Sequence, residues 1–517
     1  MSQDHSANTK RLAKNTLFLY GRMLIGMLVS LYTSRVILEA LGVVDYGIYN
    51  VVGGFVAMFA IISTALSNAT VRFLTFELGR ENKSNLKEIF STSVLIHILL
   101  CVVIIVLAET AGLWFLNYKL VIPPDRMFAA NVVFQASMVS FILGILSVPY
   151  NSCILSHEKM DIFAYIGVFQ IFANLIVVLI VRYCSFHWDV LIAYSILVVS
   201  VSVLVQVINM WYSLKHYPET HVRPHFFKSR WKEMGGFALW NAIGCSAGIL
   251  KEQGVNVLLN LFFGPTMNAS RAVAGSVNNA ISSFSGNFTN ALNPQVTKTY
   301  SSGDMDYCLS LVFKGARFSF YILMLISIPV LLETPYLLKL WLNKYPDGSV
   351  LFSRLILIAS LIETLSSTLI NLVSATGKIR NYQLIVGGLL LMNCPLSYLF
   401  LKLGYAAYSV YIVAIAVGIG CLALRLVFLN RLVGLSVKKF LKQVVLNTLM
   451  TFCCALVVPL MIYIAMPEGF LRLFILTILS VVSSALIIVY ISCNANERAF
   501  ILSKVVRIKQ RFSKTPR

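Results

Sequence analysis

Six basic residues lie inside long apolar stretches of this chain, where a charge needs a chemical reason. They are Arg22, Arg35, Lys251, Arg271, Arg317 and Arg425. A charged side chain at the centre of a bilayer costs about 2.5–3.5 kcal/mol on the insertion scale. Each base therefore needs water, an acidic partner or an anionic ligand. Because the planar guanidinium group can bind two phosphate oxygens at once, the set predicts a ligand that carries phosphate.

Some of these bases also have a purely structural explanation. Arg22, Arg317 and Arg425 lie near expected helix ends, from which long side chains can snorkel to the interface. Arg35 has Glu39 one helical turn later and can pair with it. For Arg22, Arg35 and Arg317 the structural and functional interpretations both stay open, whereas for Arg425 snorkelling is favoured.

Lys251 and Arg271 are harder to explain structurally. Lys251 lies in the middle of its segment, and the adjacent Glu252 points about 100° away around a helix. Arg271 has no acidic residue within one turn of its own helix. We expect both to face a hydrated cavity, and predict that Arg22, Arg35, Lys251, Arg271 and Arg317 bind an anionic ligand that carries phosphate.

The segment 267–296 carries two adjacent polar stripes at helical spacing. One consists of Asn278, Ser282, Ser285, Thr289 and Asn293, and the other of Gly275, Asn279, Ser283, Gly286 and Asn290. Tight helix packing through small residues is one explanation. The number of asparagines favours a water-filled path that binds a hydroxyl-rich ligand. The predicted cavity lining is Asn241, Asn256, Asn278, Ser282, Ser285, Thr289 and Asn290.

Acidic residues are few within the apolar segments. Glu252 and Glu363 are the main candidates for coupling to a proton or a sodium ion. A neutral, hydrogen-bonded Glu363 is the alternative. No cluster with metal-ligand spacing stands out, and His216, His221 and His225 are interrupted by Pro224. The sequence predicts no metal and no cofactor.

Composition indicates the elements that must position these residues. Of the 517 residues, 58% are hydrophobic and 12% are charged, and the mean hydropathy is +0.80. Soluble domains carry about 25% charged residues. The chain is therefore predicted to be an all-α polytopic membrane protein, because each span needs roughly 20 apolar residues in a helix.

Apolar runs predict about fourteen transmembrane helices. They cover residues 17–40, 46–71, 89–116, 128–155, 161–181, 190–213, 235–262, 267–296, 316–341, 351–375, 381–401, 405–429, 443–465 and 470–493. With the amino terminus inside, 28 of the 42 basic residues fall on inward connections and eight on outward ones. The positive-inside rule then places both termini in the cytoplasm. This distribution explains most of the net charge of +21 without nucleic acid.

Part of the chain repeats. Residues 41–78 align without a gap on residues 263–300, with seven identities that include Gly42 with Gly264. A shift of 219 positions also pairs Lys159 with Lys378 and Asn174 with Asn393. Two parallel six-helix lobes are predicted, at 1–214 and 234–430, with helices 13 and 14 at 431–496. A cytoplasmic interfacial linker at 215–233 joins the lobes, and an amphipathic basic tail at 497–517 rests on anionic lipid.

The opening NTLFLYGRMLIGMLVSLYTSRVILEALGVVDYGIYNVVGG resembles the amino-terminal signature of bacterial polysaccharide flippases. These form the Wzx-like branch of the multidrug/oligosaccharidyl-lipid/polysaccharide exporter superfamily. The resemblance extends over the helix count, the six-plus-six repeat and the corner at 42–47. It implies a V-shaped fold around a cationic cavity that opens alternately to each side, with Arg22, Arg35, Lys251 and Arg271 at matching positions.

The resemblance also implies a cargo and a location. The cargo is an oligosaccharide on undecaprenyl pyrophosphate, flipped from the cytoplasmic to the periplasmic leaflet of the bacterial inner membrane for O-antigen, capsule or exopolysaccharide assembly. A polysaccharide polymerase machinery is a possible partner. The alternative is a cation-coupled drug or small-molecule antiporter of the same fold. An enzyme is not expected, because the outward loops are short and no GxxxxGK[ST] nucleotide-binding motif is present.

Overall fold

The computed structural model describes most of the backbone. The described ranges are 2–59, 83–157, 159–184, 188–221, 227–376, 379–494 and 497–499, with isolated positions between 63 and 78 and at 225. Side chains are described for fewer residues, and those of 1–24 and 241–245 are not among them. The predicted amphipathic tail therefore lies almost entirely outside the described residues.

The described residues form helices and no strand, which confirms the predicted fold class. The long helices are α1 (Ser2–Ala57), α3 (Lys83–Leu107), α5 (Met127–Ser156), α6 (Met160–Tyr183), α7 (Val190–His216), α8 (Lys228–Phe263), α9 (Pro265–Ser301), α10 (Met305–Leu342), α11 (Ser349–Thr376), α15 (Ser409–Val433), α17 (Asn447–Ala465) and α18 (Phe470–Ile487). Shorter elements extend or join them: η1 (Ala108–Gly112), α4 (Leu113–Tyr118), η2 (Pro124–Arg126), η3 (Pro218–Thr220), α12 (Ile379–Tyr382), η4 (Gln383–Gly387), α13 (Gly388–Leu391), α14 (Asn393–Lys402), α16 (Val437–Phe440), η5 (Leu441–Leu446) and η6 (Ile488–Ser492).

Eleven described helical segments are long and apolar enough to cross a membrane. They are Ile25–Ala57, Asn85–Tyr118, Pro124–Ser156, Asp161–Tyr183, Val190–His216, Met305–Leu342, Ser349–Thr376, Arg380–Lys402, Ser409–Val433, Val437–Ala465 and Phe470–Ser492. Of the remaining predicted spans, 46–71 continues from α1 into residues that are only partly described. Residues 235–262 and 267–296 do form the long helices α8 and α9, but amides, hydroxyls and glycines make them too polar to count among the eleven.

Glycine breaks the helix at both copies of the predicted repeat. Gly42 interrupts α1 with φ 76° and ψ 172°, and Gly264 separates α8 from α9 with φ 76° and ψ −175°. A side chain is unfavourable at positive φ, so glycine is the residue that allows the chain to turn there. The predicted corner at 42–47 is present, and its counterpart has the same backbone geometry.

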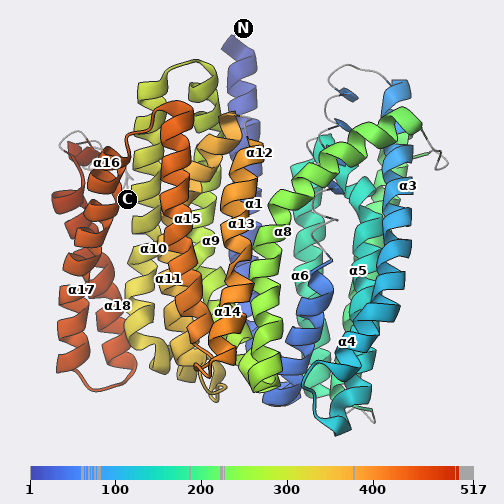
Figure 1. The fold of residues 1–517 in the computed structure, drawn as a ribbon, viewed down its shortest axis with the longest axis horizontal. Coiled ribbons are helices and arrows are strands. Elements are labelled where there is room, and N and C mark those ends of the chain that lie inside the picture. The colour runs from blue at the N-terminus through green and yellow to red at the C-terminus, as the bar shows by residue number, and fades with distance from the viewer. Residues whose placement is uncertain are drawn as a thin grey trace, which may run out of the picture. The chain divides into compact units, whose positions relative to one another are not determined.

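The chain divides into two compact units. The first comprises residues 1–276, 346–348 and 390–410, and therefore contains α1 to α8, the start of α9, and α14. Its apolar core joins α1 to α3, α5 and α7, and the ring of Phe55 stacks on that of Phe115 with centroids 5.1 Å apart. Figure 1 shows that α8 is bent: its first part slopes across this unit, and its second part runs parallel to the other helices.

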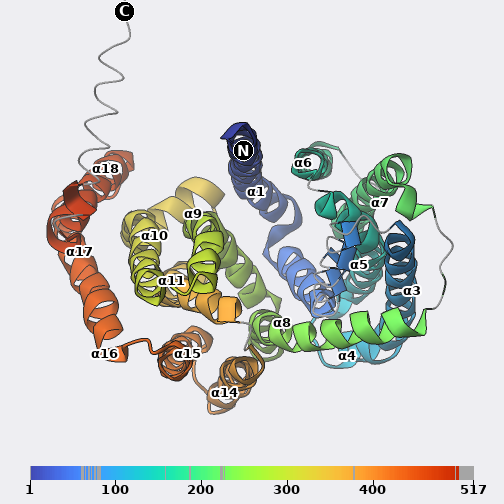
Figure 2. The same cartoon turned by 90° about the horizontal axis from the view of Figure 1, so that it is seen from above.

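The second unit comprises residues 277–345, 349–389 and 411–517. Within it α10 contacts α11, α17 and α18, and Figure 2 shows α10 between α17 and α11. The rings of Phe313 and Phe440 meet edge to face at 5.2 Å, joining α10 to the start of the α16–η5–α17 helix. The boundary between the two units falls inside α9, because the units group residues that lie close together in space. They do not test the predicted lobes 1–214 and 234–430, which were inferred from the sequence repeat and stay a prediction.

Candidate functional site

An ion pair spans the corner between α8 and α9. Nη2 of Arg271 donates to Oε2 of Glu252 at 2.8 Å and to the backbone oxygen of Glu252 at 2.9 Å. The Arg271 side chain is 12% exposed, whereas that of Glu252 is 56% exposed. Arg271 has no acidic residue within one turn of its own helix, but the preceding helix supplies an acidic partner. The carboxylate lies on the accessible side of this pair.

Glu252 lies well inside α8, far from the end of that helix. Glu252 is eleven residues before the end of α8, which is about 17 Å along a helix. Half the hydrocarbon thickness of a bilayer is about 15 Å. A carboxylate that is more than half exposed at this depth needs water around it. Lys251 is half-buried beside it and has interactions of its own. Lys251, Glu252 and Arg271 are thus brought together at one corner.

Amide hydrogen bonds hold this corner in place. Nδ2 of Asn256 donates to the backbone oxygen of Asn50 at 3.1 Å, and Nδ2 of Asn268 donates to both oxygens of Asn256 at 2.7 Å. A side chain on Gly47 would collide with the backbone of Pro265, which shows how closely α1 approaches the corner. Asn256 is buried and used in packing, so its predicted role as a cavity-lining residue is not what the structure shows.

The first polar stripe of α9 faces its neighbours in the second unit. Asn278 Oδ1 accepts from Ser282 at 3.1 Å and from Ser360 of α11 at 2.7 Å. The hydroxyl of Ser285 donates to the backbone oxygen of Ser319 of α10 at 3.1 Å. Further along, Thr289 lies 3.0 Å from the Ser319 hydroxyl, and Asn371 of α11 donates to Asn293. Helix packing therefore accounts for Ser285 and Thr289, which are buried. Asn278 and Ser282 are half-buried, and their role in lining a cavity stays a prediction.

The second stripe of α9 is the uncovered one. Asn279 and Gly286 are exposed, and a Cβ added to Gly275 or Gly286 would meet nothing within 4 Å. Every described residue of α9 that is exposed is an amide, a hydroxyl or glycine, namely Asn279, Gly286, Gln295 and Thr297. Lipid tails cannot form hydrogen bonds with these groups, so we infer that this face of α9 contacts water. The side chains of Asn290 and Asn241, two predicted lining residues, lie outside the described part.

Arg35 belongs to a different cluster. Its Nε donates to Glu39 Oε1 at 3.0 Å, and Arg182, at the end of α6, binds the other oxygen of Glu39 at 2.7 Å. The structure therefore contains the ion pair between Arg35 and Glu39 that was one of the two interpretations of Arg35. Two guanidinium groups share one carboxylate, which leaves a positive excess at this point. Arg22 lies in α1, but its side chain is outside the described residues.

Arg317 and Arg425 are buried in the second unit. Nη2 of Arg317 donates to Glu497 at 2.6 Å, and Nη1 donates to the backbone oxygen of Ser492 at 3.2 Å. Arg317 therefore has an acidic partner within the second unit, and its place in the predicted phosphate-binding set stays a prediction. Nε of Arg425 donates to the hydroxyl of Tyr382 at 2.9 Å. The snorkelling predicted for Arg425 is wrong.

Sequence reasoning missed two ion clusters because their members are far apart in the chain. Glu333 of α10 is fully buried and binds Arg472 of α18 through two bonds of 2.7 and 3.0 Å. In the first unit Arg126 bridges Asp45 and Asp189, with 2.8 Å from its Nε to Asp45. Glu333 lies between Pro329 and Pro335, where α10 departs from helical geometry. An acidic residue between two prolines in an apolar segment is the sequence signal that could have identified Glu333.

Glu363, the second predicted coupling site, lies on α11. It is exposed although the segment Ser349–Thr376 is apolar enough to span a membrane. Glu363 also has an interaction within the chain. Like Glu252, it is an exposed carboxylate on a long helix.

Known proteins resemble both the sequence and the fold of this chain. Residues 12–299 match the family described as polysaccharide biosynthesis protein, which is more than half of the chain. The chain belongs to the polysaccharide biosynthesis protein family. A curated relative of this family member is the uncharacterized membrane protein EpsK of Bacillus subtilis (strain 168), 23% identical over 302 residues. That match covers 57% of this chain and 58% of EpsK.

Several solved structures share the fold of this polysaccharide biosynthesis family member. The lipid II flippase MurJ, in an inward closed conformation, superposes with a TM-score of 0.68 at 14% identity, over 91% of this chain and 97% of MurJ. An inward-facing multidrug resistance transporter of the MATE family, in the MOP superfamily, gives 0.63 at 12% identity, over 80% and 97%. A MOP superfamily transporter of Pyrococcus furiosus gives 0.59 at 13%, over 81% and 96%. With its eleven candidate spans, the protein is a multi-pass membrane protein that shares its fold with these three structures.

Proposed function

We propose that this protein moves oligosaccharide units linked to undecaprenyl pyrophosphate from the cytoplasmic to the periplasmic leaflet of a bacterial inner membrane, for surface polysaccharide assembly. Its membership of the polysaccharide biosynthesis protein family and the fold it shares with the lipid II flippase MurJ support this proposal. The observation that carries it is the Arg271–Glu252 pair, a cation deep in a span whose partner remains accessible.

The pair gives the cation a resting partner that an anionic ligand can replace. Arg271 presents a guanidinium group, and a diphosphate offers the same paired oxygen geometry as the carboxylate with more negative charge. Glu252 is already largely exposed and loses little when it turns toward water. In this proposal Lys251 adds a second positive charge to the headgroup. Arg35 and Arg22 extend the positive region along α1.

The uncovered stripe of α9 supplies the surface for the sugar. Asn279 and Ser283 present an amide and a hydroxyl, and Gly286 lets a bulky ligand approach the helix backbone. Hydroxyl-rich glycans need such hydrogen-bonding groups in place of the water they lose. Asn290 continues the helical spacing of the uncovered stripe of α9, and together with Asn241 of α8 it completes the proposed lining.

Alternating access around this region is the proposed mechanism, with a proton or sodium ion as the coupling cation. Glu252 and Glu363 are the proposed coupling residues, because each is an accessible carboxylate in a membrane-depth helix. Both termini are proposed to be cytoplasmic, following the distribution of basic residues. Anionic lipids at the tail and a polysaccharide polymerase remain proposed partners.

The test replaces each member of the pair in cells that depend on this protein for surface polysaccharide. Arg271→Gln should abolish surface polysaccharide while lipid-linked oligosaccharide accumulates, and Glu252→Gln should retain an active phosphate site. Asn287→Gln, on the same helix, serves as a control with an unchanged charge. Normal polysaccharide in Arg271→Gln cells, with the protein present in the membrane, would refute the proposed phosphate site.

The exposed carboxylates favour a second candidate, a cation-coupled small-molecule antiporter of the same fold. In that case Glu363→Gln and Glu252→Gln would each abolish transport of a cationic dye in vesicles, and Arg271→Gln would not. Lipid-linked oligosaccharide would then show no accumulation in any of the three variants.

A further inference from the structure

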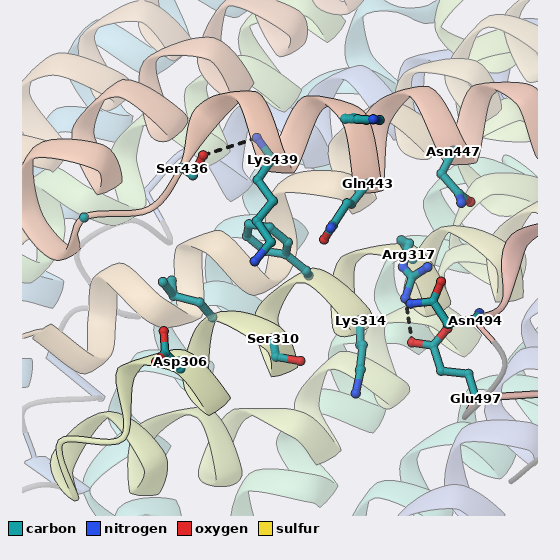
Figure 3. Close-up of a pocket in the computed structure, with 14 residues that line it drawn as sticks. Asp306, Ser310, Lys314, Arg317, Ser436, Lys439, Gln443, Asn447, Asn494 and Glu497 are labelled. Carbon is teal, nitrogen blue, oxygen red and sulfur yellow. Dashed lines mark hydrogen bonds and ion pairs between the residues drawn. The ribbon is translucent and has the colours of Figure 1, made fainter.

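A basic pocket of about 460 Å³ lies in the second unit, among helices that the proposed transport site does not use. Its walls come from the start of α10, from α16 and η5, and from the chain after η6. Pockets of a few hundred cubic ångströms are of the size that holds small ligands. Figure 3 shows Lys439 and Gln443 pointing from one wall toward Ser310 and Lys314 on the other.

One side of the pocket is fixed by an ion pair. Arg317 and Glu497 are 8% and 10% exposed, and their contact at 2.6 Å ties α10 to the chain that follows η6. Glu497 also accepts from the backbone N–H of Asn494 at 3.1 Å. Asn447 donates to the backbone oxygen of Ser492 at 3.4 Å. These contacts make the wall rigid, so the pocket is built into the fold.

The pocket carries an excess of positive charge. Lys314, Lys439 and Lys442 line it together with Arg317, against the acids Asp306 and Glu497. The three lysines are exposed and form no ion pair with any residue that the structure describes. Since Glu497 is already bound to Arg317, only Asp306 is left to balance three ammonium groups. A phosphate group is the anion whose size and charge match such a set.

The position of the pocket favours a phosphate carried by a lipid. A helix of 38 residues such as α10 is about 57 Å long, so its first turns extend beyond a hydrocarbon core of about 30 Å. Lining residues 306–314 therefore lie at headgroup depth. The apolar residues Leu309 and Phe313 share the same wall. From the pocket onward, the η5–α17 helix exposes Leu441, Leu446, Leu449 and Met450 to the surroundings.

We propose that this pocket binds the phosphate of an anionic phospholipid headgroup, with an acyl chain along the apolar surface of η5 and α17. Lys439 and Lys442 contact the phosphate from one helix, and Lys314 contacts it from the other. Arg317 is a positioning residue that holds the pocket's wall. Basic pockets between transmembrane helices are a recognised way to bind anionic lipid headgroups.

The experiment counts lipids retained by the purified full-length protein in native mass spectrometry. The probes are phosphatidylglycerol, neutral phosphatidylcholine, and glycerol 3-phosphate as the water-soluble anion without acyl chains. The test variant is Lys439→Gln with Lys442→Gln. The matched control is Lys339→Gln with Lys344→Gln, which removes two exposed lysines from the other end of α10.

Wild type and control should retain phosphatidylglycerol over phosphatidylcholine, and the test variant should bind it about tenfold or more weakly. Lys314→Gln should give a smaller loss in the same direction. Equal retention of phosphatidylglycerol by the test and control variants would overturn the site. Competition by glycerol 3-phosphate at matched concentration would show a water-soluble anion as the source and overturn the lipid assignment. Each variant should unfold at the same temperature as the wild type. Weaker retention of phosphatidylglycerol is then not caused by misfolding of the variant.

Discussion

Gly42 and Gly264 adopt the same backbone conformation 222 residues apart, with φ 76° at both and ψ values of 172° and −175°. Each ends one long helical stretch and starts the next. The matching geometry supports the internal repeat that seven identities in 38 positions suggested. Both glycines shape the corner at which α1, α8 and α9 place the Arg271–Glu252 pair.

Substituting these glycines should destabilise the protein. Gly42→Ala or Gly264→Ala should each cost about 1–2 kcal/mol of folding free energy, because a Cβ is strained at positive φ. Gly53→Ala is the matched control, since Gly53 is helical and a Cβ there meets nothing within 4 Å. Thermal unfolding of the purified protein measures the difference. Equal unfolding temperatures for Gly42→Ala and Gly53→Ala would contradict the strain argument.

The buried pair between Glu333 and Arg472 should matter for stability. Arg472→Met leaves the fully buried Glu333 without its cation and should cost about 3–5 kcal/mol, as broken buried pairs do. The double variant Glu333→Leu with Arg472→Met removes both charges and should recover most of that loss. Unfolding in denaturant measures both. A double variant as unstable as the single one would show that packing of the arginine stem, and not the charge, holds α18 to α10.

The linker after α7 should respond to acid. Nε2 of His157 lies 2.6 Å from Glu219 Oε1, and Tyr217 stacks on the His157 ring at 4.3 Å. Burial, the largest single effect, raises the pKa of Glu219. The hydrogen bond with His157, a backbone hydrogen bond and the charge of His157 together outweigh burial and hold that pKa below its ordinary value of 4.5. A carboxylate whose pKa is lowered by folding stabilises the folded protein at pH values above its ordinary pKa of 4.5. This stabilisation is lost as the pH falls through the pKa of the carboxylate in the folded protein.

Glu219→Gln should therefore be less stable than wild type at about pH 7, and this difference should shrink toward about pH 3. The readout is the thermal unfolding temperature across that range. Asp161→Asn, at the start of α6, is a control for removing a carboxylate on the same side of the unit. A stability difference that does not change with pH would rule out the titration of Glu219 as its cause.

Water access should distinguish the two stripes of α9. In a cysteine-free background, Asn279→Cys and Gly286→Cys should react with a membrane-impermeant maleimide, because their positions are exposed on a polar face. Ser285→Cys should stay unreactive, since Ser285 is buried against α10. Val457→Cys on α17 is half-exposed and should also stay unreactive, because we expect lipid there. Equal reaction rates at positions 457 and 279 would mean that exposure of the side chain alone explains the labelling. That result would contradict the inference that the uncovered face of α9 contacts water.

The sequence predicted the fold well and the site only partly. Hydropathy located the eleven apolar spans, and the Gly42 corner appeared where the polar break suggested it. Helix periodicity identified two polar stripes on α9, but both stripes carry amides and hydroxyls, including the one that packs against α10 and α11. Only tertiary contacts separate them. Arg271 pairs with Glu252, Arg317 with Glu497 and Arg472 with Glu333, each across two different elements. A search for acidic residues within one turn of the same helix cannot detect such partners.

The most direct test of the account is transport in proteoliposomes. Lipid-linked oligosaccharide with a labelled glycan is placed in both leaflets, and the fraction open to an impermeant glycan-cleaving enzyme is followed over time. Wild-type protein and the Asn287→Gln control should render nearly all of the labelled glycan accessible. Arg271→Gln should leave the inner-leaflet half protected. Rapid, complete access in the Arg271→Gln vesicles would contradict the claim that this guanidinium group binds the diphosphate during transport.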